Sequence, residues 1–521
     1  MNEKRKVLLI IMDGLGSAPA SKGNAVVLAN PQNLSSLWTT SPHTYLIASG
    51  EAVGLPKDVK GNSEVGHMNI GGGRSVTQTL PRIDKSIESG NFFKNNILKE
   101  ALQYANQNNS RVHLLALASE GGVHSHNKHI ISTIKYFSQN NFNGNLFIHA
   151  FTDGRDSPVN DANRNLDIIQ RCLNEHGIGQ IATLCGRSWA MDRNQKWERT
   201  KLAYDLLISN IGDSCGSYKQ CLLNSYSNNI SDEFVRPTVL VKDSNIRKGD
   251  VVLFLNFRPD RALQLSQAIY EQNFDKFPRS DIYPIFFASM VEYRKKFPEK
   301  VLFPKQYVNL PLGNILSTYG LRQLRISESE KFPHVTYFFN GGTAVKYQGE
   351  DRIEVPSPSV PTYDIQPEMS ALKITDLLVT RFAQNIYDFV VVNFANPDMV
   401  GHTGNIEATI KAISTVDYCV NKLVKEFTAR DGVVLITSDH GNSEELINID
   451  TDEMDTEHSY NPVPLIIVGL TQSSNRLKYG SLKDIAPTIL QIMGYPTPSE
   501  MTGKSLLSPT HNSIFNPSGN I

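Results

Sequence analysis

The sequence predicts an α/β fold made of two α/β domains. Short apolar runs rich in Val, Ile, Leu and Phe recur along the chain, and such runs are typical of buried parallel strands. The segments between them repeat apolar residues every three or four positions, which favours helices covering both faces of a sheet. Charged residues follow many of the runs directly, at the sheet edge where open α/β sheets bind ligands.

The expected strands and helices can be placed in order. The strands are 7–12 (VLLIIM), 112–118, 146–151, 181–184, 251–257, 388–395, 433–437 and 464–468. The clearest helices are 158–175 and 406–428, whose apolar positions lie on one helical face.

The residues after the runs divide the chain into two sets. Carboxylates and histidines follow the first and last runs, whereas arginines follow the middle ones. The simplest arrangement is a discontinuous metal-binding domain, 1–76 and 312–521, with an inserted substrate-binding domain, 77–311. Pro and polar residues make 75–84 and 304–314 the expected hinges, and the tail after Leu507 is expected to be frayed.

Composition excludes several classes of protein. Hydrophobic residues make up 40% of the chain, enough to form large cores, so a disordered chain is excluded. Lys and Arg total 51 against 52 Asp and Glu, so we expect neither nucleic acid nor a membrane surface as a partner. No run approaches the roughly 18 apolar residues of a membrane span, and 7–12 is too short for a secretory leader.

The cysteines indicate the compartment. They are odd in number, sparse, and form no Cys-x-x-Cys pair: Cys172, Cys185, Cys215, Cys221 and Cys419. This pattern disfavours a disulfide framework and a thiolate zinc site. We therefore expect a cytoplasmic protein.

Three carboxylates and three imidazoles follow predicted strands in the discontinuous domain: Asp13, Asp398, His402, Asp439, His440 and His458. These side chains are ligands for Mn²⁺ or Zn²⁺, and six are too many for one such ion. Two ions a few ångströms apart stabilise in-line phosphoryl or sulfuryl transfer. Taken singly each residue has an ordinary interpretation, such as a turn for Asp13; their shared position favours the metal site.

Ser63 lies in GNSEVGHMNIGGGR (61–74), immediately before a predicted helix. One interpretation is a helix cap, because Gly-Asn-Ser is good capping sequence. The other is a nucleophile activated by metal coordination, since no His-Asp pair adjoins it in the sequence. Local sequence favours the cap.

Five arginines follow the middle runs: Arg155, Arg187, Arg193, Arg258 and Arg261. Singly, each suits a surface ion pair. Together at one sheet edge they would repel one another without an anionic ligand, and guanidinium binds phosphate and carboxylate in bidentate fashion. Asp156 and His124 are titratable groups among them, able to move a substrate proton or to act as a salt bridge and a cap.

With these residues assembled, the sequence resembles the cofactor-independent (2,3-bisphosphoglycerate-independent) phosphoglycerate mutases of the alkaline phosphatase superfamily. The resemblance covers almost the whole chain. Its motifs are MDGLG (12–16), GNSEVGHMNIGGGR (61–74), GGVHSH (121–126), FTDGRD (151–156), GRSWAMDR (186–193), NFRPDRA (256–262), ESEKFPHVTYFFNGG (328–342), NPDMVGHTG (396–404), SDHGN (438–442) and EHS (457–459).

The resemblance implies a discontinuous alkaline-phosphatase-like domain with an inserted α/β transferase domain, and two Mn²⁺ ions per chain or other divalent metals in their place. It implies one ion on Asp398, His402 and His458, and another on Asp13, Ser63, Asp439 and His440, with Ser63 as the phosphorylated nucleophile. The implied substrate contacts are His124, Arg155, Asp156, Arg187, Arg193, Arg258, Arg261 and Lys331. Of these, Lys331 has no signal outside the resemblance.

The implied reaction is the interconversion of 3-phosphoglycerate and 2-phosphoglycerate in glycolysis and gluconeogenesis, without added 2,3-bisphosphoglycerate. A monomer with a small-molecule substrate is expected. Two alternatives stay open at this point: a metal-dependent phosphatase of the same superfamily, and a metal-dependent binding protein without activity. A binding protein would not need the nucleophile.

Overall fold

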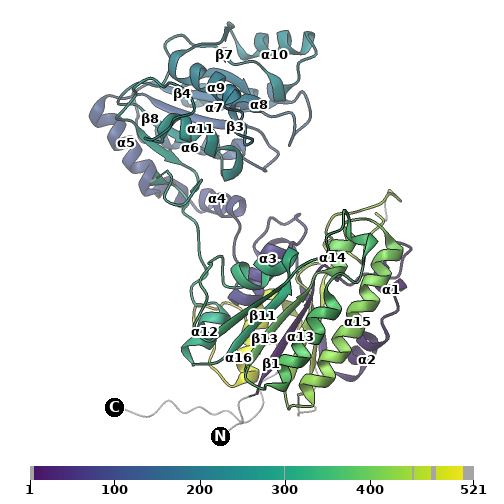
Figure 1. The fold of residues 1–521 in the computed structure, drawn as a ribbon. Coiled ribbons are helices and arrows are strands. Elements are labelled where there is room, and N and C mark those ends of the chain that lie inside the picture. The colour runs from purple at the N-terminus through teal and green to yellow at the C-terminus, as the bar shows by residue number, and fades with distance from the viewer. Residues whose placement is uncertain (1–4, 299, 449–450, 471–476, 508–521) are drawn as a thin grey trace, which may run out of the picture. The chain divides into compact units, whose positions relative to one another are not determined.

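A computed structural model describes residues 5–298, 300–448, 451–470 and 477–507. The chain forms two compact units, one from Met1–Gln78 with Tyr307–Ile521 and one from Thr79–Gln306 (Figure 1). Each unit is a sheet between helices, so the predicted α/β class is confirmed. The expected frayed tail after Leu507 lies outside the described residues.

The first unit contains an eight-stranded sheet. Its strands, in spatial order, are β12 (Glu350–Val355), β11 (Gln323–Glu328), β13 (Phe389–Phe394), β1 (Val7–Met12), β14 (Val433–Thr437), β15 (Val463–Val468), β2 (His43–Ile47) and β16 (Gly480–Ser481). β12, β11, β13, β1 and β14 are parallel, so their carboxyl ends meet at one edge.

Helices cover both faces of this sheet. They are α1 (Ala25–Leu28), α2 (Gln32–Thr40), α3 (Ser63–Gly72), α12 (Leu312–Thr318), α13 (Ala371–Ala383), α14 (Asn396–Gly401), α15 (Ile406–Thr428) and α16 (Ile485–Met493), with a short turn of helix, η5 (Ser329–Lys331), after β11. Alternate residues of β1 enter two cores, Leu9 packing with α12 and α16 and Leu8 with α13 and α15. Figure 1 shows α13 and α15 together on one face.

One predicted strand runs in the other direction. The run 464–468 forms β15, which pairs antiparallel with β14 and with β2, so the expected parallel direction is wrong. A parallel neighbour requires a crossover, usually a helix, and the described part of 438–462 contains no helix. The chain after β14 instead turns back along the same edge.

The second unit contains another eight-stranded sheet. Its strands, in spatial order, are β10 (Lys300–Val301), β9 (Phe286–Ser289), β8 (Val251–Phe254), β3 (Val112–Ala118), β4 (Leu146–Thr152), β5 (Gln180–Gly186), β7 (Thr238–Val239) and β6 (Asp213–Ser214). β8, β3, β4 and β5 are parallel neighbours, as predicted.

The helices of the second unit are α4 (Thr79–Glu88), α5 (Asn96–Asn108), α6 (Asn127–Gln139), α7 (Ala162–His176), α8 (Arg187–Ala190), α9 (Trp197–Ser209), α10 (Tyr218–Ser227) and α11 (Leu263–Tyr270), with short turns of helix η3 (Asp232–Phe234) and η4 (Pro259–Arg261). Part of the expected hinge 75–84 is helical, because α4 begins at Thr79 and buries Pro81 and Ile83. Proline is tolerated there, in the first turn.

None of the helices in the described parts of the chain combines the length and the apolarity needed to cross a bilayer.

Candidate active site

Ser63 is the first residue of α3, at the carboxyl edge of the first sheet. Asn62 caps this helix, since its side-chain oxygen accepts the Val65 N–H at 3.0 Å. The Ser63 hydroxyl is therefore free of the capping role that local sequence favoured. α3 approaches the sheet closely because residue 66 is glycine; a Cβ there would lie 2.5 Å from the Asp439 carbonyl oxygen.

Charged side chains from several strand ends surround the Ser63 hydroxyl. Ser63 Oγ donates to Asp13 Oδ1 at 3.2 Å and lies 2.9 Å from His440 Nε2. The Lys331 ammonium donates to Ser63 Oγ at 2.7 Å, to Asp13 Oδ1 at 2.8 Å and to Asp398 Oδ2 at 2.6 Å. These groups follow β1, β14, β11 and β13, four neighbouring parallel strands. The hydroxyl thus lies where the four strand ends converge.

The Nε2 atoms of His402 and His458 lie 3.2 Å apart. Asp398 Oδ1 lies 3.3 Å from His402 Nε2 and 3.4 Å from His458 Nε2. The Nδ1 atoms donate to the carbonyl oxygens of Thr456 and Gly61, each at 2.7 Å. Because a carbonyl oxygen only accepts, these bonds fix the Nδ1–H tautomer and leave each Nε2 available as a ligand.

His67 is a further buried histidine, one turn after Ser63 on α3. Its Nδ1 donates to the Ser63 carbonyl oxygen at 2.8 Å, and its Nε2 accepts from Asn393 Nδ2 at 3.0 Å. The same Asn393 amide donates to Asp13 Oδ2 at 2.7 Å. Asp439 Oδ2 lies 3.1 Å from His67 Nδ1 but accepts no aligned hydrogen bond, although it is buried. Both nitrogens of His67 are engaged, whereas this Asp439 oxygen is available to a cation.

The cluster holds three buried carboxylates, on Asp13, Asp398 and Asp439, against one buried ammonium, on Lys331. Burial alone would raise the pKa of Asp398, but Lys331 and the nearby histidines hold that pKa far below its usual range. Burial opposes the imidazolium of His440, yet the carboxylates of Asp439, Asp13 and Asp398 raise its pKa to about 10. With Lys331 and the imidazolium of His440 both counted, one carboxylate charge is still unbalanced, and buried carboxylates beside imidazoles fit divalent metal ions.

The carboxylate of Glu444 accepts hydrogen bonds from three loops at the carboxyl edge of the first sheet. One of its oxygens accepts the N–H groups of Gly16 and Asn442, both at 2.9 Å. The other accepts from the Ser459 hydroxyl and from the Asn461 amide, the latter at 3.1 Å. These partners lie in the loops after β1, after β14 and before β15. The same loops carry four of the six predicted metal ligands outside Ser63, and the other two lie on α14 and at its end. Glu444 is therefore a positioning residue.

The predicted residues of the second unit all lie in the segments that follow β3, β4, β5 and β8, at the carboxyl ends of these strands. They are His124 after β3, Arg155 and Asp156 after β4, Arg187 and Arg193 after β5, and Arg258 and Arg261 after β8. The guanidinium of Arg187 is buried and binds Asp153 Oδ1 and Asp156 Oδ2, both at 2.5 Å. Burial lowers the pKa of Arg261, and the charges of Arg187, Arg193 and Arg155 lower it further, so the arginines converge.

His124 lies between two carboxylates of this edge. Its Nε2 is 3.8 Å from Asp156 Oδ2, and its Nδ1 is 3.6 Å from Asp260 Oδ1. Burial and the Arg187 charge lower the pKa of His124 to about 4. The imidazole is thus neutral at neutral pH and able to accept a proton.

Several residues of the two clusters escaped sequence reasoning: His67, Asn393, Asn442, Glu444, Asp153 and Asp260. A buried histidine on an apolar helix face suggests core packing, and the spacing of His67 four residues after Ser63 was its only signal. Asp260 binds Arg193 Nη1 at 2.8 Å and Arg258 Nε at 3.2 Å; its position between two predicted arginines could have identified it.

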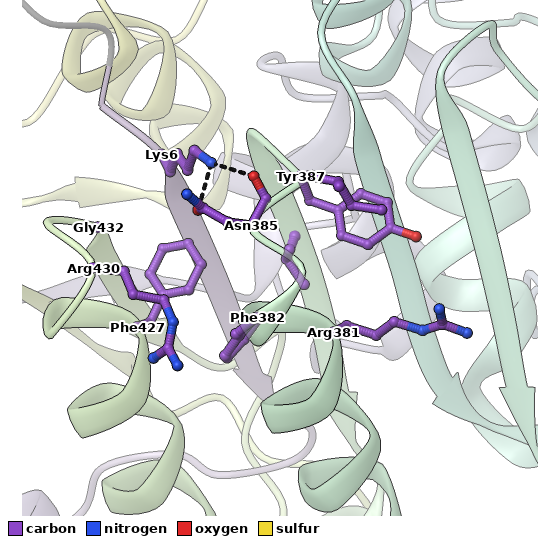
Figure 2. A pocket seen from close by; sticks show the side chains of 10 residues that line it. Lys6, Arg381, Phe382, Asn385, Tyr387, Phe427, Arg430 and Gly432 are labelled. Carbon is purple, nitrogen blue, oxygen red and sulfur yellow. Dashed lines mark hydrogen bonds between the residues drawn. The ribbon is translucent and has the colours of Figure 1, made fainter.

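A small hollow lies at the opposite, amino edge of the first sheet (Figure 2). Figure 2 shows Lys6 directed toward Asn385, whose carbonyl and side-chain oxygens accept from its ammonium at 2.8 and 2.7 Å. The hollow measures about 10 Å³, room for roughly one water molecule. The predicted residues do not line it.

Comparison with known proteins agrees with this chemistry. A family model described as the metalloenzyme superfamily matches residues 5–497. The chain is 47% identical over 510 residues to the 2,3-bisphosphoglycerate-independent phosphoglycerate mutase of Clostridium botulinum, covering 97% of this chain and 99% of the relative. It is 45% identical over 507 residues to the enzyme of the same name from Acetivibrio thermocellus, covering 96% and 99%.

A solved structure is similar over nearly the same length. It is phosphoglycerate mutase from Leishmania mexicana at low cobalt concentration, with a TM-score of 0.65 and 29% identity, covering 96% of this chain and 97% of that one. The relatives share one name, which does not favour the phosphatase alternative.

Proposed function

The chain belongs to the 2,3-bisphosphoglycerate-independent phosphoglycerate mutases, isomerases of 3-phosphoglycerate and 2-phosphoglycerate, and we propose that Ser63 carries the phosphoryl group between the two hydroxyls. The observation that carries this proposal is the contact of Ser63 Oγ with Lys331, Asp13 and His440 at 2.7 to 3.2 Å. A serine surrounded by charge in this way is activated for attack on phosphorus.

We propose that Asp398, His402 and His458 hold one divalent ion, and that Asp13, Ser63, Asp439 and His440 hold another, with Mn²⁺ as the metal. The Nε2 atoms of His402 and His458, which face each other, and the unpartnered Asp439 oxygen support these sets. The cobalt named for the Leishmania enzyme supports a divalent metal. Bound there, such ions lower the pKa of the serine hydroxyl and offset charge on the phosphoryl oxygens.

In the first step, the Ser63 hydroxyl loses its proton to water, Ser63 Oγ bonds to phosphorus, and the bond from phosphorus to the substrate oxygen breaks. Lys331 holds Ser63 Oγ in place and balances the negative charge of the phosphoryl group. The Asp156 and His124 pair takes up a proton from water when the anionic substrate binds, and passes this proton to the departing glycerate oxygen. Glycerate then turns and its other hydroxyl attacks, returning a proton to that pair and freeing Ser63. Two in-line displacements give net retention at phosphorus.

The arginines bind the substrate throughout. Guanidinium groups grip the carboxylate, and the phosphate before its transfer, in bidentate geometry, so glycerate stays bound while it turns. The nucleophile and the arginines belong to different units, and the reaction needs both at one substrate molecule.

We further propose that the protein acts in glycolysis and gluconeogenesis, in the cytoplasm, as a monomer without nucleic-acid or membrane partners. The described cysteines are all free thiols, which supports a reducing compartment. The near balance of basic and acidic residues supports a small-molecule partner.

An enolase-coupled assay tests the mechanism. Enzyme stripped of metal by chelation should be inactive, and Mn²⁺ should restore turnover without added 2,3-bisphosphoglycerate. Mass spectrometry of quenched enzyme should find phosphate on Ser63. Activity that survives exhaustive chelation, or that requires bisphosphate priming, would contradict the proposal.

A further inference from the structure

A second hollow lies in the arginine-bearing unit, and its lining includes none of the predicted substrate residues. Its volume is about 620 Å³, within the range typical of pockets for small molecules. Its walls come from α8, α9, the turn after α9, and the segment from Ile230 to Pro237. Its lining includes Trp189, Leu202, Asp205, Asp213, Ile211, Phe234 and Arg236.

Unusually exposed apolar side chains converge on this hollow. Leu202 is 47% exposed, Ile211 61% and Phe234 47%, and they come from three separate segments. Single exposed apolar residues are ordinary, but several around one concavity mark a binding site. Trp189 adds an aromatic wall, with its indole N–H donating to the Phe234 carbonyl oxygen at 3.4 Å.

The charges at the rim are already paired. Asp205 binds Lys201 at 2.5 Å, and Asp213 binds Arg236 at 3.5 Å. These pairs cancel, so the hollow offers apolar and aromatic contact without a net charge for an ionic ligand to meet. The side chains also surround a concavity and do not spread over a flat face, which favours a small molecule over a protein surface.

Two elements that line the hollow, α8 and η3, also carry or contact predicted substrate residues. Trp189 shares the short helix α8 with Arg187, whose guanidinium binds Asp156. Phe234 shares η3 with Glu233, which binds Arg155 at 3.4 Å. A molecule that packs on Trp189 and Phe234 thus contacts the two elements that position two of the arginines.

We propose that this hollow binds a flat, uncharged, largely apolar molecule, and that its occupancy changes the affinity of the enzyme for phosphoglycerate through α8 and η3. The binding half of this inference is independent of the catalytic mechanism. The coupling half rests on the proposed roles of Arg155 and Arg187.

Binding can be tested on the full-length enzyme with 5-fluoroindole, a flat neutral probe observed by ¹⁹F NMR. We expect saturable binding with a Kd of about 1 mM. Leu202→Trp should fill the hollow and weaken binding at least tenfold, and Ile211→Glu, at a more exposed position, should do the same. Leu223→Trp is the matched control, because Leu223 is 60% exposed on α10 and lies outside the hollow.

The coupling is read from initial rates. A saturating concentration of 5-fluoroindole should shift KM for 3-phosphoglycerate severalfold, with little change in kcat, in the wild type and in Leu223→Trp but not in Leu202→Trp. Absence of saturable binding, or equal binding by Leu202→Trp and Leu223→Trp, would overturn the site. Binding without a shift in KM would overturn the coupling. Loss of the mechanism proposed for Ser63 would leave the NMR result unchanged, so the two failures are distinguishable.

Discussion

Lys331 Nζ lies 2.7 Å from Ser63 Oγ, although the two residues are 268 positions apart in the sequence. Burial favours the neutral amine, but the carboxylates of Asp13, Asp398 and Asp439 raise the pKa of Lys331 above its usual value. The amine is therefore a permanent ammonium, a donor to the serine oxygen at every pH of interest. A hydrogen-bond donor in this position stabilises negative charge on the Ser63 oxygen.

Replacement of the nucleophile gives the first prediction. Ser63→Ala should lower turnover by about 10⁴-fold or more, because no oxygen is left to accept the phosphoryl group. The enolase-coupled assay measures this. Ser414→Ala, at an exposed position of α15, is the control and should be fully active. A phosphoenzyme found in Ser63→Ala would assign the nucleophile to another residue.

The ammonium gives the second prediction. Lys331→Met leaves the buried carboxylates of Asp13 and Asp398 without their partner, which should destabilise chelated protein by about 3–5 kcal/mol. Added Mn²⁺ should recover part of that loss. Thermal unfolding with and without chelator measures both effects. Lys373→Met, at an exposed position of α13, should change neither. Equal stability of Lys331→Met and wild type would show that the ammonium is not needed to balance the carboxylates.

The third prediction concerns Glu444. In the wild type, both oxygens of Glu444 accept hydrogen bonds from N–H or O–H donors of the three loops. Glu444→Gln replaces one oxygen with an N–H₂ group, which cannot accept, so some of these donors lose their acceptor. Affinity for Mn²⁺ should fall by about 10- to 100-fold, as is typical when groups behind metal ligands are changed. Titration of free Mn²⁺ by electron paramagnetic resonance measures this. Glu445→Gln, which changes only one contact with Asn461, should bind Mn²⁺ normally.

The fourth prediction concerns pH. His149 is fully buried between His113 and Thr183, at 2.9 Å from each, and burial holds its pKa well below the ordinary value. Because the native state excludes a proton that the unfolded chain binds near pH 6.5, stability is intact above that pH and falls below it. Hydrogen exchange of β4, corrected for intrinsic rates, should therefore quicken between pH 6.5 and 5.

The control for this prediction is also a histidine. His149→Gln should flatten the dependence on pH, whereas His176→Gln, at the partly exposed end of α7, should leave it as in the wild type. An unchanged slope in His149→Gln would assign the acid sensitivity to another group, with His113 the first to test.

Elements whose signals are local could be predicted from the sequence. The helix expected at 406–428 is α15 end to end, because Asn405 caps it and its own apolar stripe is buried. The helix expected at 158–175 begins late, at Ala162, whose N–H binds the Asp232 carboxylate at 2.7 Å. That partner is 70 residues away, so no local pattern reveals it. The direction of β15 likewise depends on the path of the long loop between β14 and β15, which no local pattern reveals.

The site residues likewise include some that local sequence predicts and some that it does not. Ligand-type residues directly after strands could be found, because parallel strands bring their carboxyl ends together. Lys331 and His67 could not be found from local pattern, since a lysine beside Glu330 suggests a solvated pair and a buried histidine suggests core. Lys331 acts through contacts with Asp13 and Ser63, which are distant in sequence. His67 contacts Ser63 within one helix, and its four-residue spacing does not by itself separate a site residue from a core residue.

The pairing of β1 has a consequence for synthesis of the chain. β1 lies between β13 and β14, so Val7 meets Phe389 on one side and Val433 on the other. A nascent chain therefore displays the six apolar residues of β1 unpaired until β13, which ends at Phe394, has left the ribosome, while the contiguous second unit is free to fold first. An unpaired apolar strand of this kind promotes aggregation, so chaperone dependence should concentrate on β1 and be relieved by circular permutation that joins β1 to the rest of its sheet in sequence.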